Sequence, residues 1–319
     1  MKARVSIVMC TCNGAEYIQQ QLDSLFRQTL PFYELVVQDD CSDDETCAIV
    51  EQCAADHPER RIRLFRNHKR KGWQRNFLTA VVHCEGDFVA WCDQDDVWHD
   101  DKLQVLADGI GDSQMIFSNS NLIDEQGRKQ GVMYSGMASG KLSPLASAIY
   151  PRGYGHQMLF TIEVAQRLYE FSEMKISYDY LTCCVASALG GVRYVDKPLV
   201  DWRRHSGAAT FNPTARHTSK IQGYVLAVKA LKNSGNRERT REFFRQLSLR
   251  ATFYDRALQR VVDLMAAGTT PAIVRACLVC LSHSKVVEPH AKGITRLLRA
   301  FFLPMMFIRD HGRYIVELP

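Results

Sequence analysis

The feature that most constrains the fold is an alternation of apolar runs and amphipathic segments in the first hundred residues. The runs are continuous, as in VSIVM and FVAWC, which is typical of parallel strands buried on both faces. Between them, apolar residues such as Ile18, Leu22 and Leu25 recur at helical spacing. The alternation predicts βα units and a mainly parallel sheet flanked by helices. The predicted strands cover 5–9, 34–38, 62–65 and 88–92, with helices around 18–26, from 42 onward and around 73–81.

Beyond residue 100 the pattern is mixed. Residues 135–157 are rich in Gly, Ser and Pro, which is typical of a functional loop. After Pro213 the chain has many Arg and few Gly and is predicted to be helical. The expected further elements are strands at 115–118, 131–134 and 194–200 and helices at 163–171 and 179–189. The predicted division is one domain at 1–212, with halves at 1–100 and 101–212, followed by a helical region at 213–319.

The net charge of the chain changes sign at the same boundary, between residues 212 and 213. Residues 1–212 carry a net charge of −6 and residues 213–319 a net charge of +11. An asymmetry of this size suggests two functional parts. The acidic part suits a metal site, and the basic part suits an anionic surface, either nucleic acid or membrane.

Cysteine usage bears on the compartment. The chain has 11 cysteines, an odd number, and most lie in apolar runs, which predicts reduced thiols in the cytoplasm rather than a disulfide framework. The segment MKARVSIVMC predicts a first strand rather than a signal peptide.

Polar residues follow three of the predicted strands, at 10–13, 39–42 and 93–96. In an open parallel sheet, ligands bind beyond the carboxyl ends of the strands, so these segments are predicted to face one crevice. A capping turn is the alternative for Asp39 and Asp40, because Ser42 and Glu45 have the spacing of a capping box that would open the second helix.

Known phosphate-binding loops are missing from the sequence. Neither G-x-G-x-x-G after the first strand nor a Walker A motif occurs, which argues against a dinucleotide oxidoreductase. A divalent cation held by carboxylates would serve instead. Asp93, Asp95 and Asp96 crowd like charges, which is costly unless a cation or solvent offsets them, and Mg²⁺ and Mn²⁺ prefer such ligands. The alternative is a solvated acidic turn.

Several stretches together resemble family 2 glycosyltransferases of GT-A fold, most closely the bacterial rhamnosyltransferase-like branch. The stretches are SIVMCTCNGAEYIQQQLDSLFRQTL, ELVVQDDCSDDET, GDFVAWCDQDDVWHDDKL, YDYLTCCVASALGG and YVDKPLVDWRRHSG. They cover about residues 4–207 and leave out the basic C-terminal third. The resemblance implies a Rossmann-like nucleotide-diphospho-sugar transferase fold, with a nucleotide-binding half at 1–100 and an acceptor-side half at 101–212.

The resemblance also implies a donor site. Asp40 would hydrogen-bond the pyrimidine base of the donor, Asp95 would approach the ribose, and Asp96 would bind Mg²⁺ or Mn²⁺ on the diphosphate. The remaining implied positions are Thr11, Asn13 and Lys71 on the base side and Asp93 on the metal side.

The candidate general base is Asp179, in Ser177-Tyr178-Asp179-Tyr180. Inverting transfer needs one base to take the proton of the acceptor hydroxyl. The family commonly has His-Asp here, and Tyr178 replaces the histidine. An aspartate at the head of an apolar helix can also serve only as a cap, so both roles stay open.

Two more segments match the family's site. His205 matches a position that completes the metal shell or touches the diphosphate, although a lone histidine is more often a surface or core residue. Arg203 and Arg204 beside it could clamp phosphate. Gly155 and His156 lie where the family usually has a glycine-rich loop on the acceptor side.

The basic segment 271–309 interrupts apolar runs with Arg and Lys. Its longest run, 300–308, contains Pro304 and is too short to span a bilayer. We expect this segment to contact a membrane surface as an amphipathic helix. A helical cap on the catalytic domain and a homodimer interface are the alternatives.

These observations predict an inverting, metal-dependent hexosyltransferase. It would move a sugar, rhamnose among the candidates, from a nucleotide diphosphate to a glycan or lipid-linked glycan in cell-surface polysaccharide synthesis. The expected location is the cytoplasm, peripheral on the inner face of the membrane. A metal-dependent nucleotidyltransferase is the alternative enzyme. A nucleic-acid-binding protein ranks last, because the C-terminal part has no recognisable nucleic-acid module.

Overall fold

The computed structural model describes residues 3–174, 176–207 and 220–314, so the expected boundary at Pro213 lies outside the described residues. The chain forms two compact units. The sheet unit comprises Met1–Lys141, Gly153–Met174 and Arg193–Asn212, and the helical unit comprises Leu142–Arg152, Lys175–Val192 and Pro213–Pro319. Two stretches from within the predicted domain at 1–212 thus belong with the C-terminal helices.

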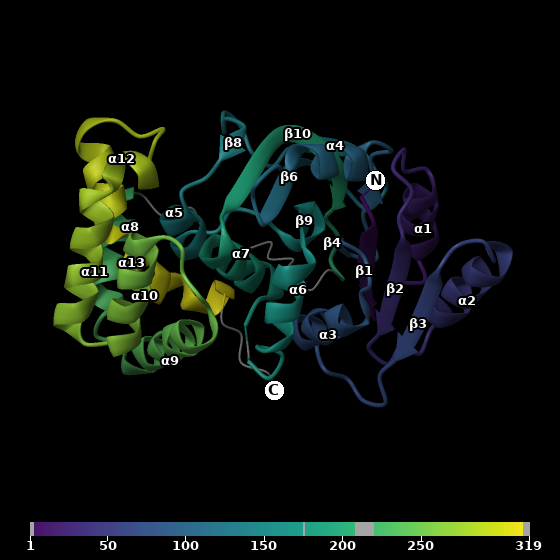
Figure 1. The fold of residues 1–319 in the computed structure, drawn as a ribbon, viewed down its shortest axis with the longest axis horizontal. Helices are drawn as coiled ribbons and strands as arrows, with labels where there is room; N and C mark the ends of the chain where they lie inside the picture. Colours follow the sequence, from purple (N-terminus) through teal and green to yellow (C-terminus); the bar gives the residue numbers. More distant parts are fainter. Residues whose placement is uncertain (1–2, 175, 208–219, 315–319) are drawn as a thin grey trace. The chain divides into compact units, whose positions relative to one another are not determined.

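The sheet unit is built on one sheet that has ten strands within the described residues. Its order is β3-β2-β1-β4-β9-β6-β10-β5, with β7 paired to β6 and β8 paired to β10. Figure 1 shows β3, β2, β1 and β4 next to one another in this order. The first four strands in this order are parallel. They are β3 (Ile62–Arg66), β2 (Glu34–Asp39), β1 (Val5–Thr11) and β4 (Phe88–Cys92). The prediction of a parallel sheet from continuous apolar runs is confirmed for this half.

The other half of the sheet is mostly antiparallel. β9 (Met158–Thr161) runs antiparallel to both β4 and β6 (Met115–Ile123). β10 (Val192–Arg203) pairs antiparallel with β5 (Val97–Trp98) and β8 (Gly140–Lys141), and β7 (Lys129–Val132) forms a hairpin with β6. The strands expected near 115, 131 and 194 are present. β9 was not predicted, because its four residues, MLFT, are too few to show a distinctive period.

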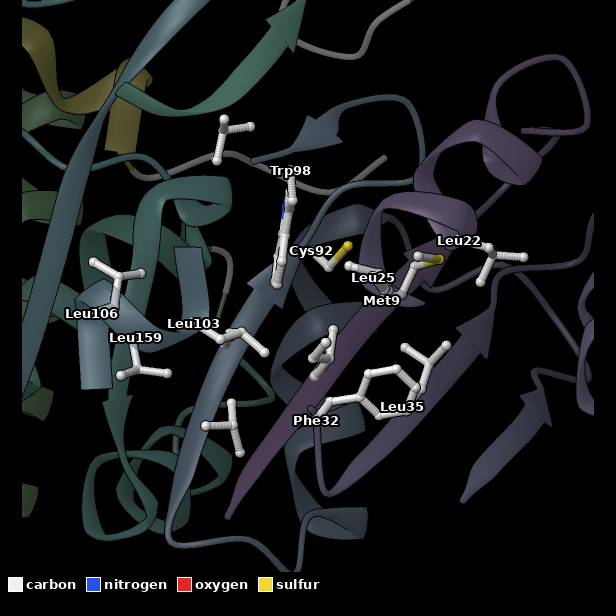
Figure 2. Packing of buried hydrophobic residues seen from close by; sticks show 14 of the residues in the cluster. Met9, Leu22, Leu25, Phe32, Leu35, Cys92, Trp98, Leu103, Leu106 and Leu159 are labelled. Carbon is white, nitrogen blue, oxygen red and sulfur yellow. The ribbon is translucent and has the colours of Figure 1, made fainter. Parts of the chain in front are cut away.

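Helices cover both faces of the sheet. Ala90 and Cys92 belong to a core cluster with residues of α1 and α4, which Figure 2 shows around Leu25, Trp98 and Leu103. Trp91 points to the opposite face, where its ring lies 5.3 Å from that of Phe77 and 4.9 Å from that of Phe160. The helical segments of this unit are α1 (Ile18–Phe26), α2 (Thr46–Asp56), α3 (Trp73–Ala80), η1 (Val81–His83), α4 (Lys102–Gly109), η2 (Gly155–Gln157) and α6 (Ile162–Tyr169).

Two local predictions were wrong. The second helix does not open with a capping box at Ser42; α2 begins at Thr46, whose backbone N–H donates to Asp44 Oδ1 at 3.0 Å. Residues 135–157 are not one loop, because they contain β8, η2 and the short helix α5 (Pro144–Ile149). Ser143 caps α5 by accepting a hydrogen bond from the backbone of Ala146, and proline suits the first helical position.

The helical unit confirms the expectation of helices at the C-terminus. Its core is aromatic, with the ring of Phe307 5.4 Å from that of Tyr180 and 5.1 Å from that of Phe244. Besides α5, its helices are α7 (Tyr178–Leu189), α8 (Lys220–Ala230), α9 (Ser234–Arg250), α10 (Arg256–Ala267), α11 (Thr270–Ser282), α12 (Ser284–Val287) and α13 (Gly293–Tyr314). The helical unit therefore draws α5 and α7 from the middle of the sequence.

The apolar stretch that was expected to face a membrane is divided in α13. Leu303 and Phe307 are buried, whereas Ile294, Leu297 and Leu298 at the start of the helix are exposed. Among the described residues, no helix combines the length and the apolar character needed to cross a membrane.

Candidate active site

The carboxyl ends of β1, β2 and β4 meet at one edge of the sheet, as predicted. Thr11 lies in register with Asp39, and its hydroxyl donates to the Asp39 carboxylate at 2.8 Å. The backbone N–H of Cys12 donates to Gln94 Oε1 at 2.9 Å, and Gln94 Nε2 donates back to the carbonyl of Cys12 at 3.1 Å. The structure thus brings the segments 10–13, 39–42 and 93–96 together.

Asp39 shapes the turn after β2. Its carboxylate accepts hydrogen bonds from the backbone N–H and the hydroxyl of Ser42. The hydroxyl oxygen of Ser42 accepts from the backbone N–H of Asn13 at 2.9 Å. Asn13 and Cys41 both have positive φ, at 50° and 63°, a strained conformation for residues other than glycine. The turns after β1 and β2 therefore hold each other in place.

Asp40 lies on the other side of that turn and is buried. Its Oδ1 accepts from the backbone N–H of Lys71 at 2.7 Å and from Asn67 Nδ2 at 2.8 Å, and its Oδ2 accepts from the backbone N–H of Gly72 at 2.8 Å. The ammonium group of Lys71 lies 3.1 Å from Thr79 Oγ1. Asp40 therefore joins the end of β2 to the loop that precedes α3. Two of the predicted base-side residues, Asp40 and Lys71, are neighbours in space.

Two carboxylates and one imidazole form a compact cluster beside these turns. One ligand atom from each of Asp93, Asp96 and His156 lies within 4.8 Å of the others. His156 Nδ1 is 3.7 Å from Asp93 Oδ2 and 4.0 Å from Asp96 Oδ2. His156 comes from η2, about sixty residues further along the chain. The sequence had suggested His156 for the acceptor side of the site, with no link to the two aspartates.

Burial shifts the ionisation of this cluster. The pKa of the Asp96 carboxyl is raised well above its ordinary value, first by burial and then by the charges of Asp95 and Asp93. The pKa of His156 is lowered well below its ordinary value by burial and by Lys102 and Arg204. His156 is therefore a neutral imidazole at neutral pH. A neutral imidazole can donate a lone pair to a metal ion.

The residues of the cluster fit a divalent cation. Asp96 Oδ1 accepts from the backbone N–H of Arg203 at 3.0 Å, whereas the buried Asp96 Oδ2 has no hydrogen-bond partner among the described residues. A buried carboxylate oxygen without a partner is costly. His156 Nε2 lies 3.1 Å from Ser120 Oγ, so its Nδ1 is the atom directed at the carboxylates. Such an outer partner is typical of metal-binding histidines.

His205 lies at a neighbouring position and contacts a different aspartate. Its Nε2 is 2.9 Å from Asp95 Oδ2, and this hydrogen bond raises the pKa of His205 above its ordinary value. The ring of Tyr17 lies 5.0 Å from the imidazole. His205 was predicted as a metal ligand together with Asp93 and Asp96, but it does not belong to their cluster in this structure.

The two predicted phosphate-binding arginines differ in their surroundings. Arg203 is buried, and its guanidinium donates to the carbonyls of Asp95 and Glu125, both at 2.9 Å, and to Gln20 Oε1 at 2.7 Å. Arg204 is partly exposed and lies over the ring of Trp202 at 4.3 Å. Arg203 thus holds the protein framework together, and Arg204 is the one with exposed surface.

One buried cation near the cluster was not predicted. The pKa of Lys102 is lowered to about 7, chiefly by burial. The available signal was its position in α4, because Lys102 lies four residues before the buried Leu106 and therefore on the same helical face. A lysine on the apolar face of a helix indicates a buried ammonium group, which can have a functional or a structural role.

Asp179 belongs to the helical unit, whereas the strand ends belong to the sheet unit. It is the second residue of α7 and is partly buried. Its Oδ1 accepts from the backbone N–H of Tyr180 at 2.7 Å and from the hydroxyl of Ser177. Burial raises the pKa of Asp179. These contacts suit a residue of the first helical turn, and a raised pKa is also what a general base needs.

Parts of the chain are similar to known glycosyltransferases. Residues 6–145 match the profile described as Glycosyl transferase family 2. An uncharacterized glycosyltransferase of Rickettsia felis is 26% identical over 70% of this chain and 37% of its own length. The Escherichia coli protein WfgD, named a UDP-Glc:alpha-D-GlcNAc-diphosphoundecaprenol beta-1,3-glucosyltransferase, is 35% identical over 32% of this chain and 38% of its own. The chain therefore spans little more than a third of the length of these relatives.

A solved structure supports the fold. The crystal structure of S. aureus TarS 1–349 in complex with UDP superposes with a TM-score of 0.54 at 20% identity and covers 97% of this chain and 91% of that one. The chain thus has a GT-A-like fold, and its residues 6–145 are similar to glycosyl transferase family 2.

Proposed function

We propose that the family 2 domain makes this chain a metal-dependent, inverting glycosyltransferase that uses a nucleotide-diphosphate sugar. The observation that carries the proposal is the convergence of three strand ends beside Asp93, Asp96 and His156. Carboxylates and a neutral imidazole are ligands for a divalent cation, and a cation is what a diphosphate needs when the site has no glycine-rich phosphate loop.

The donor nucleotide would lie across the ends of β1 and β2. Each oxygen of the Asp40 carboxylate can accept more than one hydrogen bond, so Asp40 can receive an N–H group of the base while it keeps its contacts to the backbone of Lys71 and Gly72. Thr11 and Asn13 would line the same pocket. Asp95 would receive a ribose hydroxyl, and His205 at 2.9 Å holds its carboxylate in place.

Asp93, Asp96 and His156 would hold Mg²⁺ or Mn²⁺, with His205 as the alternative histidine ligand. When bound, the cation supplies Lewis-acid stabilisation of the departing diphosphate. Arg204 is the arginine with exposed surface, so we assign it, more than the buried Arg203, to the phosphate side. Gly155 is the first residue of η2 and directly precedes His156.

Asp179 would act as the general base. In a single displacement, the acceptor hydroxyl oxygen forms the new bond to the anomeric carbon while the bond from that carbon to the diphosphate breaks. The acceptor proton passes to the Asp179 carboxylate, whose raised pKa brings it closer to the working pH of a base. Attack from the side opposite the diphosphate inverts the anomeric centre.

The acceptor would be a glycan or a lipid-linked glycan of a cell-surface polysaccharide. The relative WfgD, which is named for a diphosphoundecaprenol-linked acceptor sugar, supports a lipid-linked acceptor. We further propose that the protein works in the cytoplasm, at the inner face of the membrane. The exposed Ile294, Leu297 and Leu298 of α13 lie close in sequence to Lys292 and Arg296, a combination that suits the headgroup boundary of an anionic membrane. The alternative is that this face of α13 forms a homodimer interface.

A screen of nucleotide sugars, with nucleotide-activated rhamnose among them, tests the reaction class. The proposal expects slow release of nucleoside diphosphate from one donor, and loss of this release when a chelator removes the cation. Release of pyrophosphate from a nucleoside triphosphate would instead favour a nucleotidyltransferase. Undiminished donor hydrolysis in excess chelator would contradict the cation assignment.

A further inference from the structure

A buried lysine beside the cation cluster has no part in the function proposed above. Lys102 is the first residue of α4, and its side chain is completely buried. An ammonium group removed from water is costly unless neighbouring groups compensate for its lost hydration. The groups that surround this one therefore indicate why it is there.

Three kinds of group surround the ammonium of Lys102. Its Nζ donates a hydrogen bond to the backbone carbonyl of His156 at 2.6 Å. It also lies 3.2 Å from the centre of the Trp98 ring, a cation–π contact. The charges of Asp93 and Asp96 act on it as well. In the described part of the chain, Lys102 forms no direct ion pair with an acidic side chain. Its direct hydrogen bond goes to the main chain of His156.

The contact with His156 connects two segments that are distant in sequence. Lys102 and His156 are 54 positions apart, one at the head of α4 and the other in η2. The His156 ring is held separately, because its Nε2 lies 3.1 Å from Ser120 Oγ, which accepts from Gln157 Nε2 at 2.9 Å. The histidine is therefore fixed at two points, its ring by Ser120 and its main chain by Lys102.

Fixing both points determines where the remaining nitrogen is directed. The Nδ1 atom lies 3.7 Å from Asp93 Oδ2 and 4.0 Å from Asp96 Oδ2. A short displacement of the main chain at residue 156 would move the whole ring away from the carboxylates. Ligands of a cation site must be held within a few tenths of an ångström of the binding geometry.

We propose that Lys102 is a positioning residue of the cation site, which fixes the main chain of His156 so that the imidazole reaches a cation shared with Asp93 and Asp96. This inference rests on the cation site of the proposed function. Lys102 itself touches neither substrate nor cation, and it acts through its hydrogen bond to the His156 carbonyl. A lysine that served only to fill the core beneath α4 would not influence nitrogen coordination.

The test measures Mn²⁺ binding alone, without donor or acceptor. Electron paramagnetic resonance gives the Mn²⁺ dissociation constant, and pulsed measurements on the same samples detect coupling of bound Mn²⁺ to an imidazole nitrogen. Lys102→Met keeps the length of the aliphatic part of the side chain but removes the donor. It is expected to lose the nitrogen coupling and to raise the dissociation constant about tenfold or more, the usual scale for residues that orient a metal-binding histidine.

Gln28→Met is the matched control. Gln28 is also buried, and its Oε1 accepts from the backbone N–H of Leu103 at 3.0 Å while its Nε2 donates to the carbonyl of His99 at 2.8 Å. It is thus a polar residue tied to the start of α4 but not to His156. The control is expected to keep the coupling and to stay within about twofold of the wild-type affinity, the margin of such a measurement against the tenfold loss above.

The outcomes separate this inference from the proposed function. If the wild type does not bind Mn²⁺, the cation site of the proposed function is wrong. Binding without nitrogen coupling in the wild type, or wild-type coupling and affinity in Lys102→Met, would overturn the role of Lys102. Tighter binding with unchanged coupling would also overturn it, because only the charge of the lysine would then matter. If Lys102→Met does not fold, Lys102→Leu takes its place with the same expected losses.

Discussion

The two compact units handle charge in opposite ways. In the sheet unit, Asp96 and Lys102 are completely buried and His156 is nearly so, all beside the ends of the parallel strands. In the helical unit, the ion pair between Glu242 and Arg245 lies on the surface of α9, with about half of each side chain exposed. The interior of that unit is instead a cluster of aromatic rings around Phe307.

This difference indicates which charged side chains serve function and which only lie on the surface. Buried charges reduce stability unless they are well paired, and strongly shifted pKa values gather at functional sites. Surface pairs contribute little to stability because water screens them. Substituting one of the buried charges beside the strand ends should therefore change catalysis, whereas substituting a surface charge of the helical unit should change almost nothing. The predictions below test this contrast, beginning with the largest expected effect.

Asp96→Asn should produce the largest effect. The amide keeps the shape of the side chain but binds a cation poorly, so we expect transfer to fall by about a thousandfold or more, the scale of a lost electrostatic contribution at an active site. Without metal, the variant should be at least as stable as the wild type, because it lacks a carboxylate whose charge is disfavoured first by burial and then by Asp95 and Asp93. Activity assays and thermal unfolding in chelator measure both effects. If the variant keeps its activity, the cation does not bind at Asp96.

Asp179→Asn tests whether one carboxyl group of the helical unit also takes part in catalysis. The amide oxygen can still accept from the backbone N–H of Tyr180, so the helix should persist. Turnover should fall by about a hundredfold or more, as for a lost general base, while nucleoside diphosphate still binds. Calorimetry with the nucleotide and steady-state assays check this. If the folded variant turns over normally, Asp179 is only part of the first turn of its helix.

Replacement of Ile294 and Leu297 by serine tests the surface of α13. Both side chains are exposed, so the fold should tolerate the change, but sedimentation with anionic vesicles should fall several-fold at low salt because apolar insertion is lost. The control is Leu249→Ser, since Leu249 is an exposed leucine of α9. Equal loss in the control, or none in the double variant, would argue against membrane contact through α13. A shift from dimer to monomer would favour the homodimer interface.

Glu242→Gln should produce the smallest effect. Hydrogen bonds from Arg245 and then Gln246 lower the pKa of Glu242 to about 2. The contribution of this carboxylate to the free energy of unfolding is therefore fully present above its ordinary pKa of about 4.3, and it is lost as the pH falls through about 2. After allowance for solvent screening, it amounts to about 0.5 kcal/mol or less. Urea unfolding at pH 7 measures it, and activity should not change. A loss of several kcal/mol would mean that charge matters equally in both units.

The sequence alone determined the parallel half of the sheet and the positions of its strand ends. A parallel strand buried on both faces is apolar at nearly every position, so VSIVM and FVAWC are recognisable without any partner. Polar residues that follow such strands must meet at one edge of the sheet. Asp40 and Asp93 to Asp96 could therefore be selected from the order of the residues.

Only the tertiary structure decided which residues complete the site. β9 joins β4 to β6 in antiparallel pairing, and this brings His156 to Asp93 and Asp96 from about sixty positions away. The same folding buries Lys102 against the main chain of His156, and it groups α5 and α7 with helices beyond residue 220. Local periodicity specifies which face of a segment is buried, but not which distant segment covers it. These contacts depend on pairing across the fold, which no single stretch of sequence encodes.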